Sequence, residues 1–306
     1  MSDIGFVGLG KMGGNMARRL RSRNISVAGF SRNPEQARDL AAETGVEAAE
    51  SLERLVQCLS VPRVVWLMVP AGEATQQTID RLAALLSPRD IIVDGGNSYY
   101  RDSMRRAGEL ARHGIRFVDA GVSGGIWGLE NGYALMVGGD AEAVSTIERF
   151  LKLLAPDPRS GWLHCGPTGS GHFVKMVHNG IEYGMMQSLA EGLALLQARA
   201  DFRLDLAAVT EMWRHGSVVR SWLLDLTAEF LKQEGGLDAV APYVADSGEG
   251  RWTAIEAIEQ GVPAPVMSLA LMTRFASQGG DDFAAKLLSM MRLGFGGHAV
   301  RNESGR

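Results

Sequence analysis

The segment Ile4–Leu20 reads IGFVGLGKMGGNMARRL and decides the fold of the first half of the chain. Ile4–Val7 is a short apolar run typical of a buried strand, and helix-forming residues follow from Asn15. The turn between them has the spacing G-x-G-x-x-G and consists of Gly8, Leu9, Gly10, Lys11, Met12 and Gly13. Such glycines permit a tight turn and a close approach of the backbone to a pyrophosphate at a helix N-terminus. We therefore expect this turn to bind a dinucleotide, although a glycine-rich turn without a ligand has the same pattern.

Short apolar runs and helix-like segments alternate through the first half of the chain. The expected strands are Ile25–Phe30, Val64–Val69, Ile91–Asp94, Phe117–Asp119, Ala134–Val137 and Trp162–Cys165, and the expected helices among them are Glu73–Leu86, Arg101–Arg112 and Ala141–Leu154. This alternation predicts an α/β fold with a Rossmann-like, doubly wound and mostly parallel sheet.

Helical periodicity replaces the alternation from Gly171 onward. The expected helices are Phe173–Ala200, Ala207–Arg214, Ser221–Lys232, Trp252–Ile258, Pro265–Ser277 and Asp282–Leu293. We therefore predict a dinucleotide-binding domain at residues 1–168 and an all-α domain for substrate binding and dimerisation at residues 169–306.

Bulk composition limits the classes of partner and compartment. The 306 residues carry a net charge of −4, so nothing indicates a nucleic-acid or membrane partner. Cys58 and Cys165 are the only cysteines, and no cluster has metal-ligand spacing. This usage indicates a reducing compartment, and the N-terminus enters a strand at once, so we expect no signal peptide, a cytoplasmic location and no metal.

The end of the second strand bears on the choice of coenzyme. About 20 residues past the glycines, an NAD-binding chain carries an acidic residue for the ribose 2′-hydroxyl, but this chain has Ser31 and Arg32. A guanidinium can hydrogen-bond a 2′-phosphate, so we expect NADP, with NAD and a merely solvated Arg32 as the alternatives. Met68, Val69 and Pro70 end the next strand and are expected to contact the coenzyme at the same edge of the sheet.

Polar and small residues follow two further strands. Asn97 comes after Ile91–Asp94, and Ser123, Gly124 and Gly125 come after Phe117–Asp119. Ligands bind beyond the carboxyl ends of strands in such sheets, so we expect these residues to hold an acidic substrate and Asn97 to contact the coenzyme as well. The alternative is that they are ordinary turn residues.

One polar stripe stands out on the first long helix. The segment Gly166–Gly184 reads GPTGSGHFVKMVHNGIEYG, and Lys175, His178, Asn179 and Glu182 occupy positions i, i+3, i+4 and i+7. On a helix they share one arc about 100° wide, whereas most other positions are apolar or small. We expect the apolar side to be buried and the stripe to face a polar pocket. An ordinary charge ladder on a solvated face is the alternative.

Five motifs together make the chain resemble the decarboxylating 6-phosphogluconate dehydrogenase family, within the β-hydroxyacid dehydrogenase superfamily. They are GLGKMGGNMARRL at Gly8–Leu20, DGGNSYYRD at Asp94–Asp102, GVSGG at Gly121–Gly125, GHFVKMVHNGIEYG at Gly171–Gly184 and RWTAIEAIEQGVP at Arg251–Pro263. The resemblance covers nearly the whole chain, which is similar to the short form of the family.

The resemblance implies a role for each matching residue in converting 6-phosphogluconate to ribulose 5-phosphate and CO2, a reaction of the pentose phosphate pathway. Lys175 is implied as general base and acid, and Glu182 as the second acid. The implied sugar-acid contacts are Asn97, Ser123, Gly124, Gly125, His178 and Asn179. Tyr183 and Arg274 are implied phosphate contacts, while Arg292 and His298 of the tail reach the neighbouring active site of a homodimer. A frayed basic terminus is the alternative for this tail.

Some positions depart from the family pattern. The loop Asp246–Gly250 is short and offers Glu249 where the family usually carries a further lysine and threonine, and Ile126 and Trp127 replace acidic residues of longer members. Three alternatives therefore stay open: a related aldonate substrate, a non-decarboxylating dehydrogenase of 3-hydroxyisobutyrate or tartronate semialdehyde, and a nucleotide-sensing protein without turnover.

Overall fold

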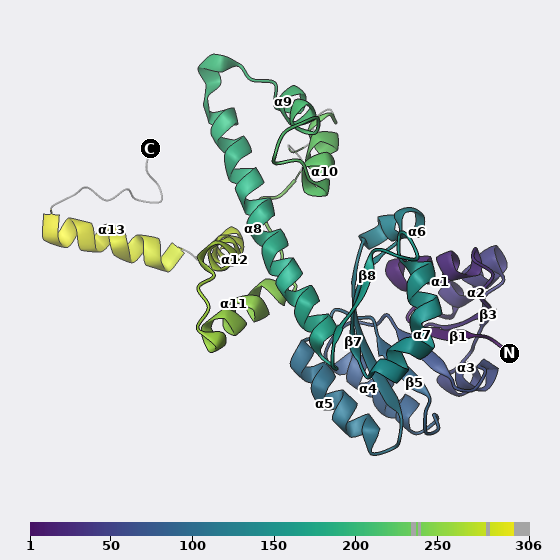
Figure 1. The fold of residues 1–306 in the computed structure, drawn as a ribbon. Coiled ribbons are helices and arrows are strands. Elements are labelled where there is room, and N and C mark those ends of the chain that lie inside the picture. Colours follow the sequence, from purple (N-terminus) through teal and green to yellow (C-terminus); the bar gives the residue numbers. More distant parts are fainter. Residues whose placement is uncertain (234–236, 238–239, 280–281, 297–306) are drawn as a thin grey trace. The chain divides into compact units, whose positions relative to one another are not determined.

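The chain forms two compact units, Met1–Val177 and His178–Arg306. The computed structural model (Figure 1) describes residues 1–233, 237, 240–279 and 282–296. The boundary between the units falls inside one continuous helix, α8 at Ser170–Ala198, whereas the sequence places it at 168/169, just before that helix. None of the helices described is long and apolar enough to cross a membrane.

A single eight-stranded sheet, with the order β3-β2-β1-β4-β5-β6-β7-β8, forms the first unit. Its strands are β1 Ile4–Val7, β2 Val27–Phe30, β3 Glu47–Ala48, β4 Val64–Leu67, β5 Ile91–Asp94, β6 Arg116–Ser123, β7 Ala134–Gly139 and β8 Trp162–Gly166. Every neighbouring pair is parallel except β6 with β7. The predicted mostly parallel sheet is confirmed, and its strand order reverses next to β1, where such folds bind dinucleotides.

Helices cover both faces of this sheet (Figure 1). One core joins the strands to α1 Lys11–Arg21, α2 Pro34–Thr44 and α7 Ala141–Leu154, and the other joins them to α3 Leu52–Cys58, α4 Glu73–Ala83 and α5 Tyr100–Ala111. Successive strand residues supply opposite faces, as Phe6 and Val7 do. Strands buried on both faces explain why the sequence shows continuous apolar runs there.

β3 and α3 of this unit lack a clear sequence signal, and β6 differs from its predicted length. β3 is only two residues long, and α3 follows it at once, with the Ser51 hydroxyl accepting a hydrogen bond from the Arg54 N–H. β6 is longer than predicted because its second half pairs antiparallel with β7, from Val118 opposite Gly139 to Ser123 opposite Ala134. The strand therefore ends at Ser123, four residues beyond the predicted end at Asp119.

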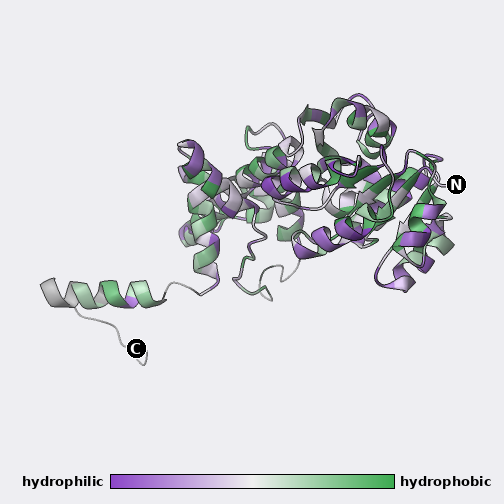
Figure 2. Ribbon diagram, turned by 90° about the horizontal axis from the view of Figure 1, so that it is seen from below, coloured by the Kyte–Doolittle hydropathy of each residue, from purple (hydrophilic) through white to green (hydrophobic). Residues whose placement is uncertain are grey.

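The second unit is helical. After α8 come a short 3-10 turn, Ala200–Phe202, and the helices α9 Leu206–Trp213, α10 Trp222–Leu231, α11 Glu249–Gln260, α12 Pro265–Ser277 and α13 Asp282–Gly296. Gly180 allows close packing of α8, because a methyl group there would come within 2.7 Å of Thr253 and 3.1 Å of Met267. The expectation of a fully buried apolar side is wrong, since Ile181 is 51% exposed. The helix α13 also carries hydrophobic residues along its length (Figure 2).

Candidate active site

The glycine turn after β1 has the geometry that a dinucleotide requires. Gly8 has a φ of +93°, and a methyl group there would overlap the Met68 carbonyl. A methyl group at Gly13 would overlap the Gly8 carbonyl oxygen, whereas Gly10 faces open space. The N-cap of α1 is Gly10, and no side chain caps the helix there. The first-turn N–H groups of α1 can therefore receive a pyrophosphate, and the residues present fit the coenzyme.

A cavity of about 890 Å³ extends from this turn along the edge of the sheet. Of the predicted coenzyme contacts, it is lined by Gly8, Leu9, Gly10, Ser31, Arg32, Met68, Val69 and Pro70. Lys11, Met12 and Gly13 belong to the first turn of α1 and, like Asn97, are not among the lining residues. The structure adds Arg81 of α4, which belongs to no motif and was not predicted as a coenzyme contact.

A buried network carries the loop with Asn97. Asn97 itself is exposed just beyond β5, but Asp94 at the end of that strand is fully buried beside Arg106 of α5 at 3.1 Å. The Asp94 carboxylate accepts hydrogen bonds from the Ser98 hydroxyl (2.8 Å) and the Gly96 N–H (3.1 Å). Arg106 also donates to the Gly72 carbonyl (3.2 Å), so it ties the Asn97 loop to the loop beside Pro70. Breaking such a pair costs about 3–5 kcal/mol.

The loop of Ser123, Gly124 and Gly125 lies at the end of β6. Gly124 and Gly125 have φ values of +137° and +54°, which favour glycine. Tyr133 packs closely against the loop, because a methyl group at Gly124 would come within 3.2 Å of its ring. Burial raises the pKa of Tyr133 to about 12, and the positive charge of Arg19 offsets only part of this effect.

Lys175 lies on the second turn of α8 and is only 9% exposed. Gly121 of β6 makes room for it: a methyl group there would overlap Lys175 Cβ and come within 2.9 Å of its Cγ. The amine-bearing side chain thus leaves the helix against bare strand backbone. Gly121 of the GVSGG motif therefore contributes to the placement of the lysine.

The remaining stripe residues belong to the second unit. The His178 Nδ1 lies 3.0 Å from Asn179 Oδ1 and 3.9 Å from Glu182 Oε2. The side chains of His178 and Glu182 are 40% and 39% exposed, so this part of the stripe is open to solvent, as a ligand would require. Because α8 is continuous, the i, i+3, i+4, i+7 spacing from Lys175 to Glu182 keeps all four residues along one side of one helix.

The predicted phosphate contacts lie together in the second unit. The Arg274 guanidinium carbon is 3.4 Å from the centre of the Tyr183 ring. The Tyr183 hydroxyl reaches Asp246 at 3.4 Å, and Asp246 pairs with Arg251 at 2.8 Å. Burial would raise the pKa of Asp246, but hydrogen bonds from the Gly248 N–H and Arg251, with the Arg251 charge, hold that pKa below its usual range.

Glu249 is not a loop residue, contrary to expectation. It begins α11, is 2% exposed and accepts a hydrogen bond of 2.6 Å from the Ser247 hydroxyl. Its position at the first turn favours a carboxylate through the helix dipole. The acidic residue is therefore part of a helix start, with Gly250 next to it in contact with the Tyr183 ring.

Two predicted site residues cannot be placed. His298 and the side chain of Arg292 lie outside the described residues. In the part of the chain that is described, no three His, Cys, Asp or Glu side chains form a group that could hold a metal ion.

Comparison with known proteins covers both units. Residues 3–165 match the NAD binding domain of 6-phosphogluconate dehydrogenase, and residues 171–298 match the C-terminal domain of 6-phosphogluconate dehydrogenase. The chain is 42% identical over 302 residues to the NAD(+)-dependent, decarboxylating 6-phosphogluconate dehydrogenase of Haloferax volcanii, with 98% of this chain and 99% of that protein covered. It is 38% identical over 288 residues to the decarboxylating 6-phosphogluconate dehydrogenase of Staphylococcus aureus, with 90% of this chain and 61% of that protein covered.

Among solved structures, the chain is similar to the 6-phosphogluconate dehydrogenase of Plasmodium falciparum, known in its apo form, with NADP+ and with 6-phosphogluconate. The TM-score is 0.84 at 30% identity, and the match covers 99% of this chain and 67% of the other. These two longer relatives extend beyond the matched part.

Proposed function

The chain belongs to the 6-phosphogluconate dehydrogenase family and is an NAD(P)-dependent, decarboxylating oxidoreductase, and we propose that Lys175 and Glu182 carry its acid–base chemistry. The reaction converts 6-phosphogluconate to ribulose 5-phosphate and CO2. The observation that carries the residue assignment is the buried side chain of Lys175, held against Gly121 on the helix that also bears Glu182. A solvated charge ladder would leave Lys175 exposed, as surface lysines are.

In the proposed mechanism, the chain's own groups move the protons. When bound, the oxidised nicotinamide supplies a hydride acceptor. Lys175 accepts the proton of the substrate C3 hydroxyl, which requires surroundings that favour the neutral amine. The resulting 3-keto acid loses its carboxylate as CO2, and protonated Lys175 donates to the C3 oxygen as negative charge develops on it. Glu182 then gives a proton to substrate C2, which lost CO2 and becomes C1 of ribulose 5-phosphate, while Lys175 takes back the proton of the C3 hydroxyl as the ketone forms.

The substrate contacts follow from the same arrangement. We assign the sugar-acid end to Asn97, Ser123, Gly124, Gly125, His178 and Asn179. Tyr183 and Arg274 hold the phosphate, and the position of the Arg274 guanidinium carbon 3.4 Å from the centre of the Tyr183 ring supports this role, because it keeps a positive charge beside Tyr183. Asp246 is neutralised by Arg251 and so opposes an approaching phosphate less than a lone carboxylate would.

The direct test of this function measures NAD(P)H and CO2 together. The purified chain with 6-phosphogluconate should form equal amounts of both with at least one coenzyme. NAD(P)H without CO2 would identify a non-decarboxylating dehydrogenase, and neither product would indicate binding without turnover.

We propose NADP as the coenzyme because the side chains that line the cavity at Gly8 carry positive charge. The lining includes Arg32 and Arg81, and no Asp or Glu is among the described residues that line it. Two guanidinium groups favour a 2′-phosphate, whereas a bare ribose 2′-hydroxyl is usually held by a carboxylate. Glu53 pairs with Arg81 at 3.3 Å but both side chains are largely exposed, so the pair offsets little of this attraction.

Replacing Arg32 by alanine should separate the two coenzymes. A charged hydrogen bond to a phosphate contributes about 1.5–3 kcal/mol, so NADP binding should weaken about 10- to 100-fold while NAD binding stays within about twofold. Titration of each coenzyme by fluorescence checks this, with Arg38→Ala on the exposed side of α2 as the control. Equal weakening of both coenzymes contradicts the assignment.

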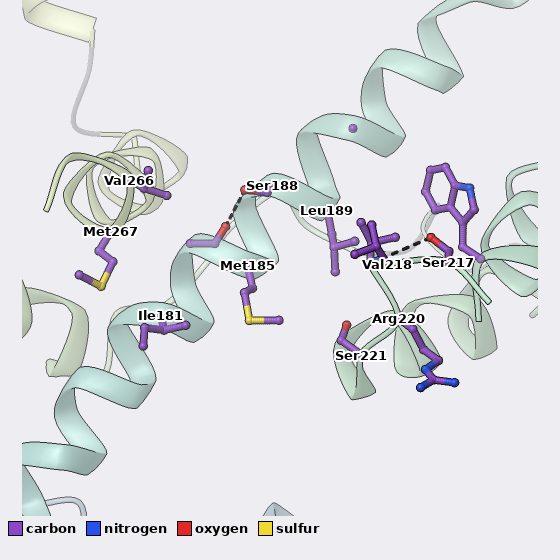
Figure 3. Close-up of a pocket in the computed structure, with 14 residues that line it drawn as sticks. Ile181, Met185, Ser188, Leu189, Ser217, Val218, Arg220, Ser221, Val266 and Met267 are labelled. Atoms are coloured by element: carbon purple, nitrogen blue, oxygen red, sulfur yellow. Dashed lines mark hydrogen bonds between the residues drawn. The ribbon is translucent and has the colours of Figure 1, made fainter. Parts of the chain in front are cut away.

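We further propose a homodimer in which α13 of one copy lies in an apolar groove of the other. The groove, about 890 Å³, is formed by α8, the segment around Val218 and the start of α12 (Figure 3). It runs along α8 from Ile181 to Gly192, about 16 Å at the helical rise. Four exposed apolar residues share one face of α13 at helical spacing: Phe283, Leu287, Met290 and Met291. The end of the groove at Ile181 is next to Glu182 in the sequence of α8, so a helix in the groove would approach the proposed site.

Mixed dimers test whether the tail acts in trans. Lys175→Ala and His298→Ala chains should each be nearly inactive, but a mixed dimer has one site with both residues intact. Random exchange of subunits should therefore restore about a quarter of the wild-type activity. A tail that serves its own chain would give no restoration, and a chain that sediments as a monomer would exclude the dimer.

A further inference from the structure

We propose that Asp119 is a positioning residue for the reaction: its buried carboxylate fixes the first turn of α8 on the sheet and so sets where the Lys175 amine lies. This inference rests on the proposed role of Lys175. Asp119 occupies β6 and is fully buried, two residues before Gly121. None of the steps above uses its carboxylate as an acid, a base or a substrate contact.

The Asp119 carboxylate binds the start of α8 with both oxygens. Its Oδ1 accepts a hydrogen bond of 2.6 Å from the Gly169 N–H, and its Oδ2 accepts one of 2.8 Å from the His172 N–H. The first N–H groups of a helix have no partner within the helix and carry its positive dipole end. A side chain from a strand therefore does what an N-cap residue does for other helices, and it links the helix to the sheet.

The two elements then meet along matching rows. Asp119 and Gly121 are on one face of β6 at a spacing of about 6.6 Å, and Gly171 and Lys175 are about one helical turn apart, at about 6 Å along the axis. Gly171 lies so close to the strands that a methyl group there would overlap the Met136 carbonyl and come within 2.7 Å of the Gly138 N–H. One turn further on, Lys175 packs on Gly121 in the same way. The carboxylate fixes the first contact, and the second follows from the helix geometry.

A second anchor holds the same turn from α5. The Ser103 Oγ lies 2.7 Å from His172 Nδ1, and both residues are buried, at 0% and 1% exposure. The main chain of residue 172 is thus bound by Asp119 while its ring is bound by Ser103. Rotation of the first turn about the helix axis would break both contacts at once, so the direction of Lys175 is set from two elements.

Replacing Asp119 by asparagine keeps the size but turns an amide group towards one of the two N–H donors. A displacement of about 1 Å at a reacting group can cost about 10²-fold in rate, so we expect kcat to fall about 10- to 100-fold. The Kd for the coenzyme should stay within about twofold, because the glycine turn and its cavity do not include these contacts. The deuterium isotope effect on kcat, with substrate deuterated at C3, should rise as hydride transfer becomes limiting. A smaller folded fraction alone would not move it.

Asp140→Asn is the matched control. Asp140 caps α7 through two backbone N–H groups, Glu142 at 3.0 Å and Ala143 at 3.2 Å, and it is exposed. This variant makes the same exchange of a carboxylate for an amide at a helix cap outside the proposed site, and its kcat and isotope effect should equal those of the wild type. If Asp119→Asn also keeps the wild-type kcat per folded molecule, or shows an unchanged isotope effect, the proposal is overturned.

A third variant covers the case in which Asp119→Asn does not fold. Ser103→Ala removes the contact to the His172 ring, and it should lower kcat several-fold with a raised isotope effect; wild-type values would overturn the two-element account. Wild-type turnover of 6-phosphogluconate in the same assay separates failure of this inference from failure of the proposed function. A wild-type chain without turnover refutes the function first.

Discussion

Lys175→Ala is expected to lower the rate of NAD(P)H formation from 6-phosphogluconate by about 10²- to 10⁴-fold or more, as loss of a general base does. The side chain is buried at the start of α8, and alanine leaves no amine there to accept the proton of the C3 hydroxyl. The Kd for the coenzyme should change little. The measurement is single-turnover NAD(P)H formation, which reports hydride transfer apart from product release.

Lys152→Ala serves as the control for this variant. Lys152 of α7 is a half-exposed lysine paired with Glu148 at 2.6 Å, and its loss should leave turnover unchanged. Turnover by Lys175→Ala close to that of the control would remove Lys175 from the mechanism.

Glu182→Gln is expected to slow release of ribulose 5-phosphate about 10²-fold while hydride transfer is affected far less. Glutamine keeps the size and the hydrogen-bonding reach of the side chain but has no acidic proton to give to substrate C2. NAD(P)H should therefore form in a first-turnover burst that exceeds the ribulose 5-phosphate released, and acid quenching should trap the keto intermediate.

Glu191→Gln provides the comparison on the same helix. Glu191 lies further along α8 and accepts a hydrogen bond of 2.8 Å from Gln187, so its replacement should change neither step. Equal losses of hydride transfer and of product release in Glu182→Gln would argue against a specific role as the second acid.

The fold could be predicted from the sequence where a local pattern carries the physics. The glycines from Gly8 to Gly13 mark a turn between a strand and a helix. The helix α12 is observed at Pro265–Ser277 as predicted, because a proline at its start fixes the boundary. β3 escaped prediction because two residues of strand have no period. A strand was predicted at the position of β7, but its antiparallel direction was not, because strand direction depends on partners far along the chain.

The candidate site divides in the same way. Lys175, Asn97 and the Ser123 loop belong to short motifs and could be named from the sequence. Asp119, Arg106 and Tyr133 could not, because their importance comes from contacts across the chain: Asp119 binds Gly169 and His172, which lie 50 and 53 residues later. Such residues look like ordinary strand or helix positions until the elements are brought together.

The unbroken course of α8 has a consequence for how this chain can vary. Seven residues separate Lys175 from Glu182, which is about 10.5 Å of helix axis and nearly two full turns. Inserting or deleting one residue between them would turn one group about 100° away from the other, whereas exchanges on the remaining positions leave their separation intact. We therefore expect this segment to tolerate substitutions far better than insertions or deletions. An insertion or deletion between these two positions would then distinguish homologous chains that have lost the proposed chemistry from those that keep it.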